Sequence, residues 1–329
     1  MPWPGLPLTM SLVLLLALWI DRRWGEPPVA VHPVVWIGNY LQVCGDFTVR
    51  CRPAPAFALG ALAWCVGASL VGALAWALQA LATWQLVQFI LRPGLISALA
   101  AIAMAGAMAW LLKSMLSWRM LVDEASAVEV ALRQSLPAGR ERLSWLVSRD
   151  TANLTESQVR ESAIETLAEN LNDSVVAPIF WFVLLGLPGA AVYRFANTAD
   201  AMWGYRGTYR GQHWEWAGKW AAWADDALSW LPARLTALLL VAVTGHSWLG
   251  RLRREAGKTP SPNSGWPMAA MAMALGVTLG KPGVYSLNAN GLEPQANDLC
   301  LAKKYASKVL FALIQLALVA IFFVTRTFS

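Results

Sequence analysis

One predicted helix near the middle of the chain carries a row of carboxylates. They recur every fourth residue and therefore share one helix face; they are Glu161, Glu165, Glu169 and Asp173. Oxygen ligands of this kind suit Mg²⁺, which usually binds through one or two carboxylates plus substrate phosphates. The row also fits a solvated face neutralised by Arg149 and Arg160, and the residue types alone favour that simpler interpretation.

A second group of polar residues follows about thirty positions later. Asn197 and Asp200 supply oxygen atoms, and Arg206 supplies a two-pronged anion donor. Lys219 comes next, ahead of the adjacent acids Asp225-Asp226. Such paired acids can bind a metal, or can favour a helix N-terminus through its dipole. Together these residues predict carboxylates, amides and cations on one side of a membrane.

Two loops add further candidates. Asn263 and Trp266 lie at a turn-rich entry to a short apolar helix, where free backbone N–H groups could bind an anion, although a plain loop-to-helix junction fits equally well. His32 follows the first apolar run and suits proton transfer, but a lone histidine is more often structural. The sequence contains no GxxxxGK[ST], GxGxxG, GxSxG or HExxH motif. If the protein uses ATP, it does so without a standard phosphate loop.

The composition places these residues in a membrane protein. Hydrophobic residues make up 57% of the 329 residues and charged residues 14%, against about 45–50% and about 25% in soluble domains. This balance excludes an ordinary soluble enzyme and a disordered chain. The net charge of +6 is spread over the gaps between apolar runs, which is typical of a multi-pass membrane protein and not of a nucleic-acid-binding one.

Apolar runs define the expected spans, since about 20 apolar residues cross a bilayer. The four clearest runs are Leu6–Ile20, Ala56–Leu81, Leu95–Leu112 and Val309–Thr325. Three others are ambiguous: Val175–Val192, Leu235–Leu249 and Trp266–Leu279. The first of these is broken at Gly186-Leu187-Pro188-Gly189, which indicates a re-entrant hairpin or a kinked helix. We expect an all-α, polytopic integral membrane domain over residues 1–329, with about four to six transmembrane helices, re-entrant or interfacial helices, and large cytoplasmic loops.

Two polar connections are expected to form the active site on the cytoplasmic side. They are residues 113–174 and 195–230, and both are rich in Lys and Arg. Within the first, Thr155 and Gln158 fit a capping box that starts a helix ending near Asn172. An apolar stripe on that helix, from Val159 to Leu171, is expected to be buried.

Many short motifs, in one order, resemble the CobD/CbiB family of cobalamin biosynthesis proteins, the adenosylcobinamide-phosphate synthases. They include Gly25-Glu26-Pro27-Pro28, His32-Pro33-Val34, Arg149-Asp150, Ala168-Glu169-Asn170, Asn197-Thr198 with Asp200, Pro232-Ala233-Arg234, Ser261-Pro262-Asn263 and Gly265-Trp266-Pro267-Met268. The chain departs from the family pattern at Glu26, where the family usually has Asp, and at Ala199, where it often has Leu. Trp223-Ala224 stands where the family commonly has Arg-Leu, so a cation is lost there.

The resemblance implies a reaction and a set of roles. It implies ATP- and Mg²⁺-dependent joining of adenosylcobyric acid to aminopropanol O-phosphate, or a related amino alcohol, at the bacterial cytoplasmic (inner) membrane. The lipid bilayer is then a partner, other cobalamin-biosynthesis enzymes are possible partners, and nucleic acid is not. The implied catalytic residues are Glu165, Glu169, Asp200, Lys219 and Arg206. The implied substrate-binding residues are His32, Arg149, Asn170, Asn197, Arg234, Asn263 and Trp266. The implied metal ligands are Asp173, Asp225 and Asp226.

Two other classes of function compete. A membrane transporter or binding protein for a corrinoid or other anionic ligand would place polar groups inside its spans, whereas Ala56–Leu81 and Leu95–Leu112 carry no charge. A structural subunit that docks other enzymes would show no ATP-dependent product formation.

Overall fold

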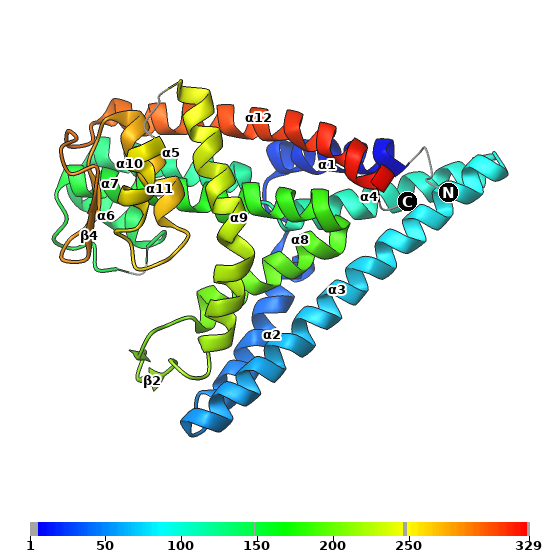
Figure 1. Ribbon diagram of the computed structural model, residues 1–329, viewed down its shortest axis with the longest axis horizontal. Helices are drawn as coiled ribbons and strands as arrows, with labels where there is room; N and C mark the ends of the chain where they lie inside the picture. The colour runs from blue at the N-terminus through cyan, green and yellow to red at the C-terminus, as the bar shows by residue number, and fades with distance from the viewer. Residues whose placement is uncertain (1–5, 148, 246–248, 328–329) are drawn as a thin grey trace. The chain divides into compact units, whose positions relative to one another are not determined.

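The computed structural model describes residues 6–147, 149–245 and 249–327, and these form helices joined by loops and two small β-hairpins (Figure 1). The α-helices are α1 Leu6–Trp24, α2 Pro33–Thr48, α3 Pro53–Leu91, α4 Leu95–Ser114, α5 Trp118–Gln134, α6 Leu136–Ser144, α7 Glu156–Leu171, α8 Ala177–Trp203, α9 Lys219–Thr244, α10 Leu249–Ala256, α11 Gly265–Leu275 and α12 Ala296–Thr327. A 3₁₀ turn spans Val29–Val31 and a π-helical turn spans Asn172–Val176. The predicted all-α class is confirmed.

Five helical stretches are long and apolar enough to cross a membrane, within the four to six expected from the sequence. They are Pro53–Leu91, Leu95–Gln134, Glu156–Trp203, Lys219–Thr244 and Ala296–Val324. Helix α1, which contains the run Leu6–Ile20, is not among them. The run that starts at Leu235 belongs to the longer helix α9, while residues 246–248 lie outside the described part of the chain. Helix α11 is short and its residues 267–274 are all buried, so it is a core helix.

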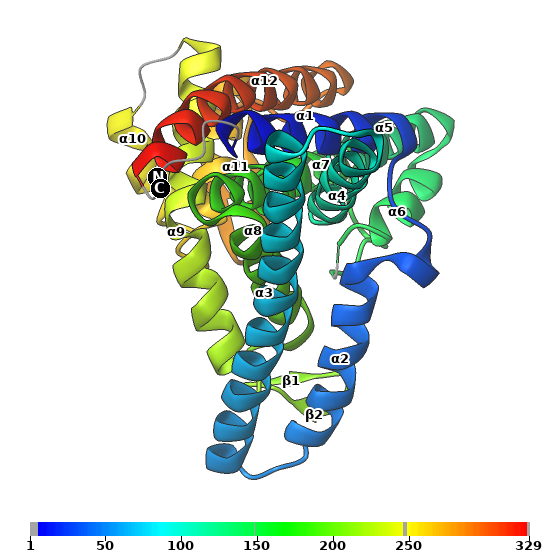
Figure 2. The ribbon, with the colours of Figure 1, turned by 90° about the vertical axis from the view of Figure 1, so that its right-hand side faces the viewer.

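The described residues divide into two compact units, and each has its own core. The first unit comprises described residues up to 117, residues 177–228, and the end of the chain from 317. In it, α3 packs against α4 and α8, and α2 packs against both α3 and α8. A cluster that includes Leu41, Phe195 and Trp203 fills the centre. The β1–β2 hairpin, Thr208–Tyr209 paired with Gln212–His213, lies beside α2 in Figure 2.

Glycines of α3 make room for close contacts with neighbouring segments in this unit. A Cβ on Gly67 of α3 would lie 2.4 Å from the Phe195 ring, and one on Gly60 would lie 2.2 Å from the Ala217 carbonyl oxygen. Small residues at such contacts let backbones approach within a membrane, where the hydrophobic effect does not drive helix association.

The predicted break in the run Val175–Val192 is a kink in α8. Gly186 has φ 69° and ψ −157°, a conformation outside the helix that favours glycine. The freed backbone is satisfied from α3, because Leu187 N–H donates to Gln79 Oε1 at 2.7 Å. Helix α8 bends along its course (Figure 1).

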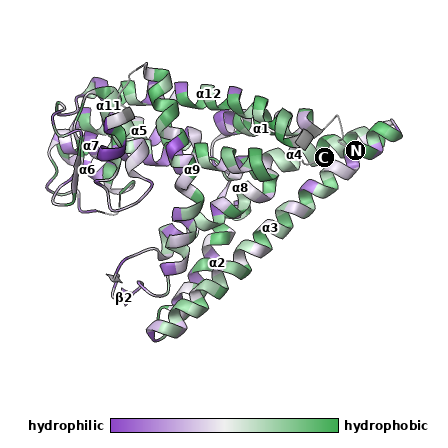
Figure 3. Ribbon diagram, viewed as in Figure 1, coloured by the Kyte–Doolittle hydropathy of each residue, from purple (hydrophilic) through white to green (hydrophobic). Residues whose placement is uncertain are grey.

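The second unit comprises residues 118–176 and the described residues of 229–316. Here α5 packs on α6 and α7, and α11 packs on α7 and α10. The β3–β4 hairpin, Leu279–Lys281 paired with Tyr285–Leu287, lies against α7 and α11. Residues 113–174, predicted as a polar connection with one helix from Thr155, therefore contain α5 and α6 as well. Hydrophilic residues gather on α6 and α7, whereas α3 and α4 of the first unit are largely hydrophobic (Figure 3).

Candidate active site

Local sequence signals fix where helix α7 begins and which face it buries. Thr155 Oγ1 accepts from Gln158 N–H and Gln158 Oε1 accepts from Thr155 N–H, so the predicted capping box is confirmed. The predicted apolar stripe from Val159 to Leu171 is buried, also as expected. This burial fixes the rotation of α7 and thereby the direction of its carboxylate row.

The carboxylate row is not a uniform solvated face. The Glu165 side chain is only 5% exposed and forms an ion pair with Arg149, whose Nη2 lies 2.9 Å from Glu165 Oε2. The same Nη2 donates to Ser162 Oγ at 2.5 Å. Glu161 and Glu169 are half-buried. Arg149 thus neutralises the row as proposed, but Arg160 does not, because it pairs with Glu129 at 2.9 Å and with Glu156 at 2.6 Å.

One oxygen of Glu165 is available for chemistry. Among the described residues, Glu165 Oε1 is buried and has no hydrogen-bond partner of ordinary length. Tyr285 of β4 interacts electrostatically with this carboxyl group, and burial together with the Glu165 charge raises the pKa of the tyrosine. Tyr285 therefore keeps its proton at neutral pH. Sequence analysis missed Tyr285, since only the pairing of β3 with β4 brings it to α7.

The π-helical turn after α7 holds an amide network. Asn172 Nδ2 donates to Asp173 Oδ1 at 2.7 Å, and Thr236 Oγ1 donates to Asn172 Oδ1 at 3.0 Å. Asn170 Nδ2 donates to the Thr166 carbonyl oxygen at 3.0 Å. Asp173 is thus oriented by its neighbour, and π-turns of this kind occur frequently at functional sites.

Arg234, Asn263 and Trp266 form a second polar cluster in this unit. Arg234 Nη1 donates to Asn263 Oδ1 at 2.8 Å, and Nη2 donates to the Pro262 carbonyl oxygen at 3.1 Å. The guanidinium also lies over the Trp230 and Trp266 rings, 4.3 and 4.8 Å from their centroids. The three residues predicted from separate motifs do come together, but the Arg234 guanidinium donates several of its hydrogen bonds to oxygens within the protein.

The remaining candidates of the second polar group lie in the first unit. The Arg206 guanidinium is close enough to the Asp226 carboxylate for an electrostatic attraction between them. Lys219 Nζ lies over the Trp216 ring, 4.4 Å from the ring centroid. Asp200 and Asn197 are half-buried in the last turns of α8, and Asp225 is half-buried in α9. The Asp200 carbonyl oxygen accepts from Gly204 N–H at 2.7 Å, which completes the last turn of that helix.

His32 belongs to a buried charge cluster in the first unit. Its Nδ1 accepts from Val34 N–H and caps α2, while its Nε2 lies 3.0 Å from Glu26 Oε2. Lys113 Nζ lies 3.2 Å from the same Glu26 oxygen and 3.8 Å from Asp21 Oδ1, and Lys113 and Asp21 are at most 1% exposed. Burial by itself would raise the pKa of Glu26, but the contacts with His32 and Lys113 lower it. Sequence analysis missed Lys113 as a site residue, because its partners lie about ninety positions away.

The described residues bring no three His, Cys, Asp or Glu side chains together as a metal site. Asp173, or the Asp225-Asp226 pair, could supply one or two oxygen ligands to Mg²⁺, and phosphate oxygens would have to complete the shell. A metal held by Asp173, Asp225 or Asp226 therefore stays a prediction from the sequence.

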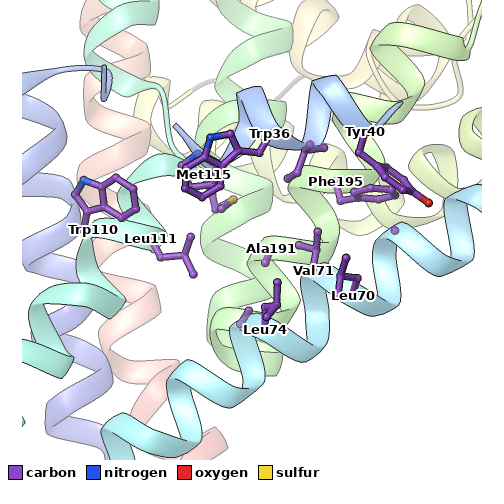
Figure 4. Close-up of a pocket in the computed structure, with 14 residues that line it drawn as sticks. Trp36, Tyr40, Leu70, Val71, Leu74, Trp110, Leu111, Met115, Ala191 and Phe195 are labelled. Carbon is purple, nitrogen blue, oxygen red and sulfur yellow. The ribbon is translucent and has the colours of Figure 1, made fainter. Parts of the chain in front are cut away.

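An apolar cavity of about 340 Å³ lies in the first unit between α2, α3, α4 and α8 (Figure 4). Trp36, Leu70 and Phe195 are among its lining residues, and the hydroxyl of Tyr40 is already committed to the Ala63 carbonyl oxygen at 2.8 Å. The lining is almost wholly apolar, and no carboxylate, amide side chain or cation is among the described residues that form it, so the polar clusters are the better candidates for an active site.

The fold and these clusters define a polytopic helical membrane protein with buried acid–base groups. The sequence model of the CobD/CbiB protein family matches residues 14–310, and the chain belongs to this family. It is 39% identical over 281 residues to the probable cobalamin biosynthesis protein CobD of Methanothermobacter thermautotrophicus, covering 84% of this chain and 86% of the relative. It is 40% identical to the cobalamin biosynthesis protein CobD of Chromobacterium violaceum, covering 83% and 82%. No solved structure matches the chain.

Proposed function

We propose that the protein acts in cobalamin biosynthesis as an ATP-dependent acid–amine ligase in the bacterial inner membrane, with its active site on the cytoplasmic side. Its substrates are adenosylcobyric acid and aminopropanol O-phosphate or a related amino alcohol, and its product is adenosylcobinamide phosphate. Family membership supports the pathway. The observation that carries the reaction type is the buried Glu165 carboxyl group, held by Arg149 on Oε2, with no hydrogen bond of ordinary length to Oε1 among the described residues and with Tyr285 close enough to interact with the carboxyl group.

Amide formation in water requires an activated acid. A carboxylate oxygen of the corrinoid attacks the γ-phosphorus of ATP, the bond to ADP breaks, and an acyl phosphate forms. The amine nitrogen then attacks the acyl carbon, a C–N bond forms, and inorganic phosphate leaves. The nitrogen must lose a proton in this step, so a base is needed within hydrogen-bond reach.

Glu165 is the proposed base. Its Oε2 is fixed by Arg149 Nη2, and its Oε1 would accept the proton from the amine nitrogen. Tyr285, whose proton is retained, can donate to an oxygen that gains negative charge. Burial excludes water from this carboxyl group, which limits hydrolysis of an acyl phosphate. Mg²⁺, bound with phosphate oxygens, would supply positive charge to the transferring phosphoryl group.

The test compares two buried carboxylates that share the same kind of partner. Glu165 and Glu129 each lie 2.9 Å from an arginine nitrogen. We expect Glu165→Gln to lower the rate of ATP-dependent product formation by at least about 100-fold, since general-base catalysis contributes about 10²–10⁴-fold. Glu129→Gln should destabilise the fold yet leave the rate per folded molecule within about threefold of the parent.

The assay uses purified full-length protein in detergent with adenosylcobyric acid, the amine, ATP and Mg²⁺, and follows the corrinoid product by mass spectrometry. Equal rate losses in both variants would refute the role of Glu165. Tight corrinoid binding without product in the parent would instead favour the transporter or binding-protein alternative.

A further inference from the structure

A polar cavity in the second unit has not been assigned any role. It is an open pocket of about 530 Å³, lined by residues of α10, the end of α11 and the turn after β4. The polar residues of its lining are Arg251, Arg254, Glu255, Asn288 and Asn290. The volume lies within the range of about 300–1,000 Å³ that is typical of small-molecule sites.

The cations of this cavity differ from Arg149 and Arg234, the arginines that the resemblance implies in substrate binding. Arg149 and Arg234 donate to oxygens inside the protein. By contrast, Arg254 has no partner within the part of the chain that the structure describes, and Arg251 makes one long contact, at 3.3 Å, with Asn288 Oδ1. Each guanidinium carries five N–H donors. Most donors of the pair are therefore available to a ligand.

The carboxylate in the cavity does not cancel this positive charge. Glu255 Oε2 accepts from Lys258 Nζ at 2.7 Å and from the Asn288 backbone N–H at 2.7 Å. Lys258 and Arg251 both attract the Glu255 charge, and the cations Arg251, Arg254 and Lys258 outnumber this single carboxylate, so the net charge stays positive. An anion is the ligand that this arrangement favours.

The part of the lining that Asn288 forms is fixed by several hydrogen bonds. Asn288 is buried, and its backbone has a positive φ of 49°, which asparagine tolerates better than most residues. Its Nδ2 donates to the Val277 carbonyl oxygen at 2.9 Å, and its own carbonyl oxygen accepts from Gly291 N–H at 2.7 Å. The residues at 277 and 292 are joined in a β-bridge. A wall fixed in this way preserves the cavity without a ligand.

We propose that this cavity binds the phosphate group of a soluble phosphate ester, with Arg251 and Arg254 as its direct ligands. Planar guanidinium groups bind phosphate through paired hydrogen bonds. Under the proposed function, ATP or the amino-alcohol phosphate would be this ester; the site itself stands on the cavity and its cations.

The experiment measures equilibrium binding of ATP, aminopropanol O-phosphate and inorganic pyrophosphate to the full-length protein in neutral detergent. Arg254→Ala is the principal variant, because this side chain has no partner to lose. Arg253→Ala is the matched control: Arg253 lies on the same helix, is exposed, carries the same charge and does not line the cavity. We expect Arg254→Ala and Arg251→Ala to weaken binding of at least one probe by about 10- to 100-fold, as befits lost charge-assisted hydrogen bonds. Arg253→Ala should change it by less than about twofold.

Three results would overturn the inference. The first is an equal loss in Arg253→Ala, which would indicate unspecific attraction to a basic helix. The second is unchanged binding in Arg254→Ala. The third is displacement of the probes by phosphatidylglycerol but not by glycerol 3-phosphate, which would indicate a lipid headgroup site. The proposed function can fail by itself: ligase activity would then be absent while arginine-dependent binding of the probes persists. The phosphate site can also fail by itself: ligation would then proceed normally in Arg254→Ala, with unchanged KM for both phosphate substrates.

Discussion

Removing the Lys113 charge should strongly destabilise the first unit. Lys113 Nζ lies 3.2 Å from Glu26 Oε2 and 3.8 Å from Asp21 Oδ1. At an effective dielectric constant of about 20, these separations correspond to gross attractions of about 5 and about 4 kcal/mol. The desolvation of the lysine offsets part of this sum. Breaking a buried pair from one side typically costs about 3–5 kcal/mol, since the remaining charge is left uncompensated. We therefore expect Lys113→Met to lower the free energy of unfolding by about 3–5 kcal/mol.

The assay is denaturant unfolding in a fixed detergent, followed by tryptophan fluorescence. Lys303→Met is a suitable control, because within the described part of the chain Lys303 Nζ donates to the neutral Ser126 Oγ, at 2.7 Å, and to no carboxylate. Its loss should cost about 1 kcal/mol. Neutralising the partners as well, by Asp21→Asn and Glu26→Gln, should restore much of the lost stability. A Lys113→Met protein within about 1 kcal/mol of the parent would refute this reasoning, as would a triple variant no more stable than the single one.

Three further predictions concern stability. The pKa of Glu26 is lowered in the folded protein, so its ionised form stabilises the fold above the ordinary pKa of 4.5, and this contribution is lost as the pH falls below that value. Measurements of the free energy of unfolding at graded pH should show this loss. Glu26→Gln should remove that part of the pH dependence. Gly186→Ala should cost about 1–3 kcal/mol because φ is 69°, while Gly106→Ala, with open space around it, should gain about 0.5–1 kcal/mol. Thr155→Ala should cost about 1 kcal/mol through the lost cap; a change of less than a few tenths would contradict the capping role.

Local signals in the sequence predicted local structure. The capping box at Thr155 and the kink near Gly186 depend on neighbouring residues and on backbone conformations that one residue type allows. Hydropathy likewise indicated the long apolar helices. The hydropathy pattern, however, began one apolar run at Leu235, whereas helix α9 begins at Lys219. The difference arises because Asp225 and Asp226 lower the local hydropathy but do not end the helix.

Long-range grouping could not be predicted in the same way. Lys113 meets Glu26 across 87 positions, and the cavity at Arg251 is closed by Asn288 from the turn after β4. The spacing of residues along the sequence does not indicate contacts between residues this far apart in the chain. Residue types likewise could not indicate that Arg234 stacks on Trp230 and donates to Asn263, because these contacts depend on the tertiary fold.

The most direct measurement is the stoichiometry of product formation by the purified protein. With adenosylcobyric acid, aminopropanol O-phosphate, ATP and Mg²⁺, we predict one adenosylcobinamide phosphate for each ADP and phosphate released. The same reaction should be at least about 100-fold slower in Glu165→Gln, with Glu129→Gln near the parent rate. ADP release without amide formation, or amide formation at the parent rate in Glu165→Gln, would contradict the proposed ligase site.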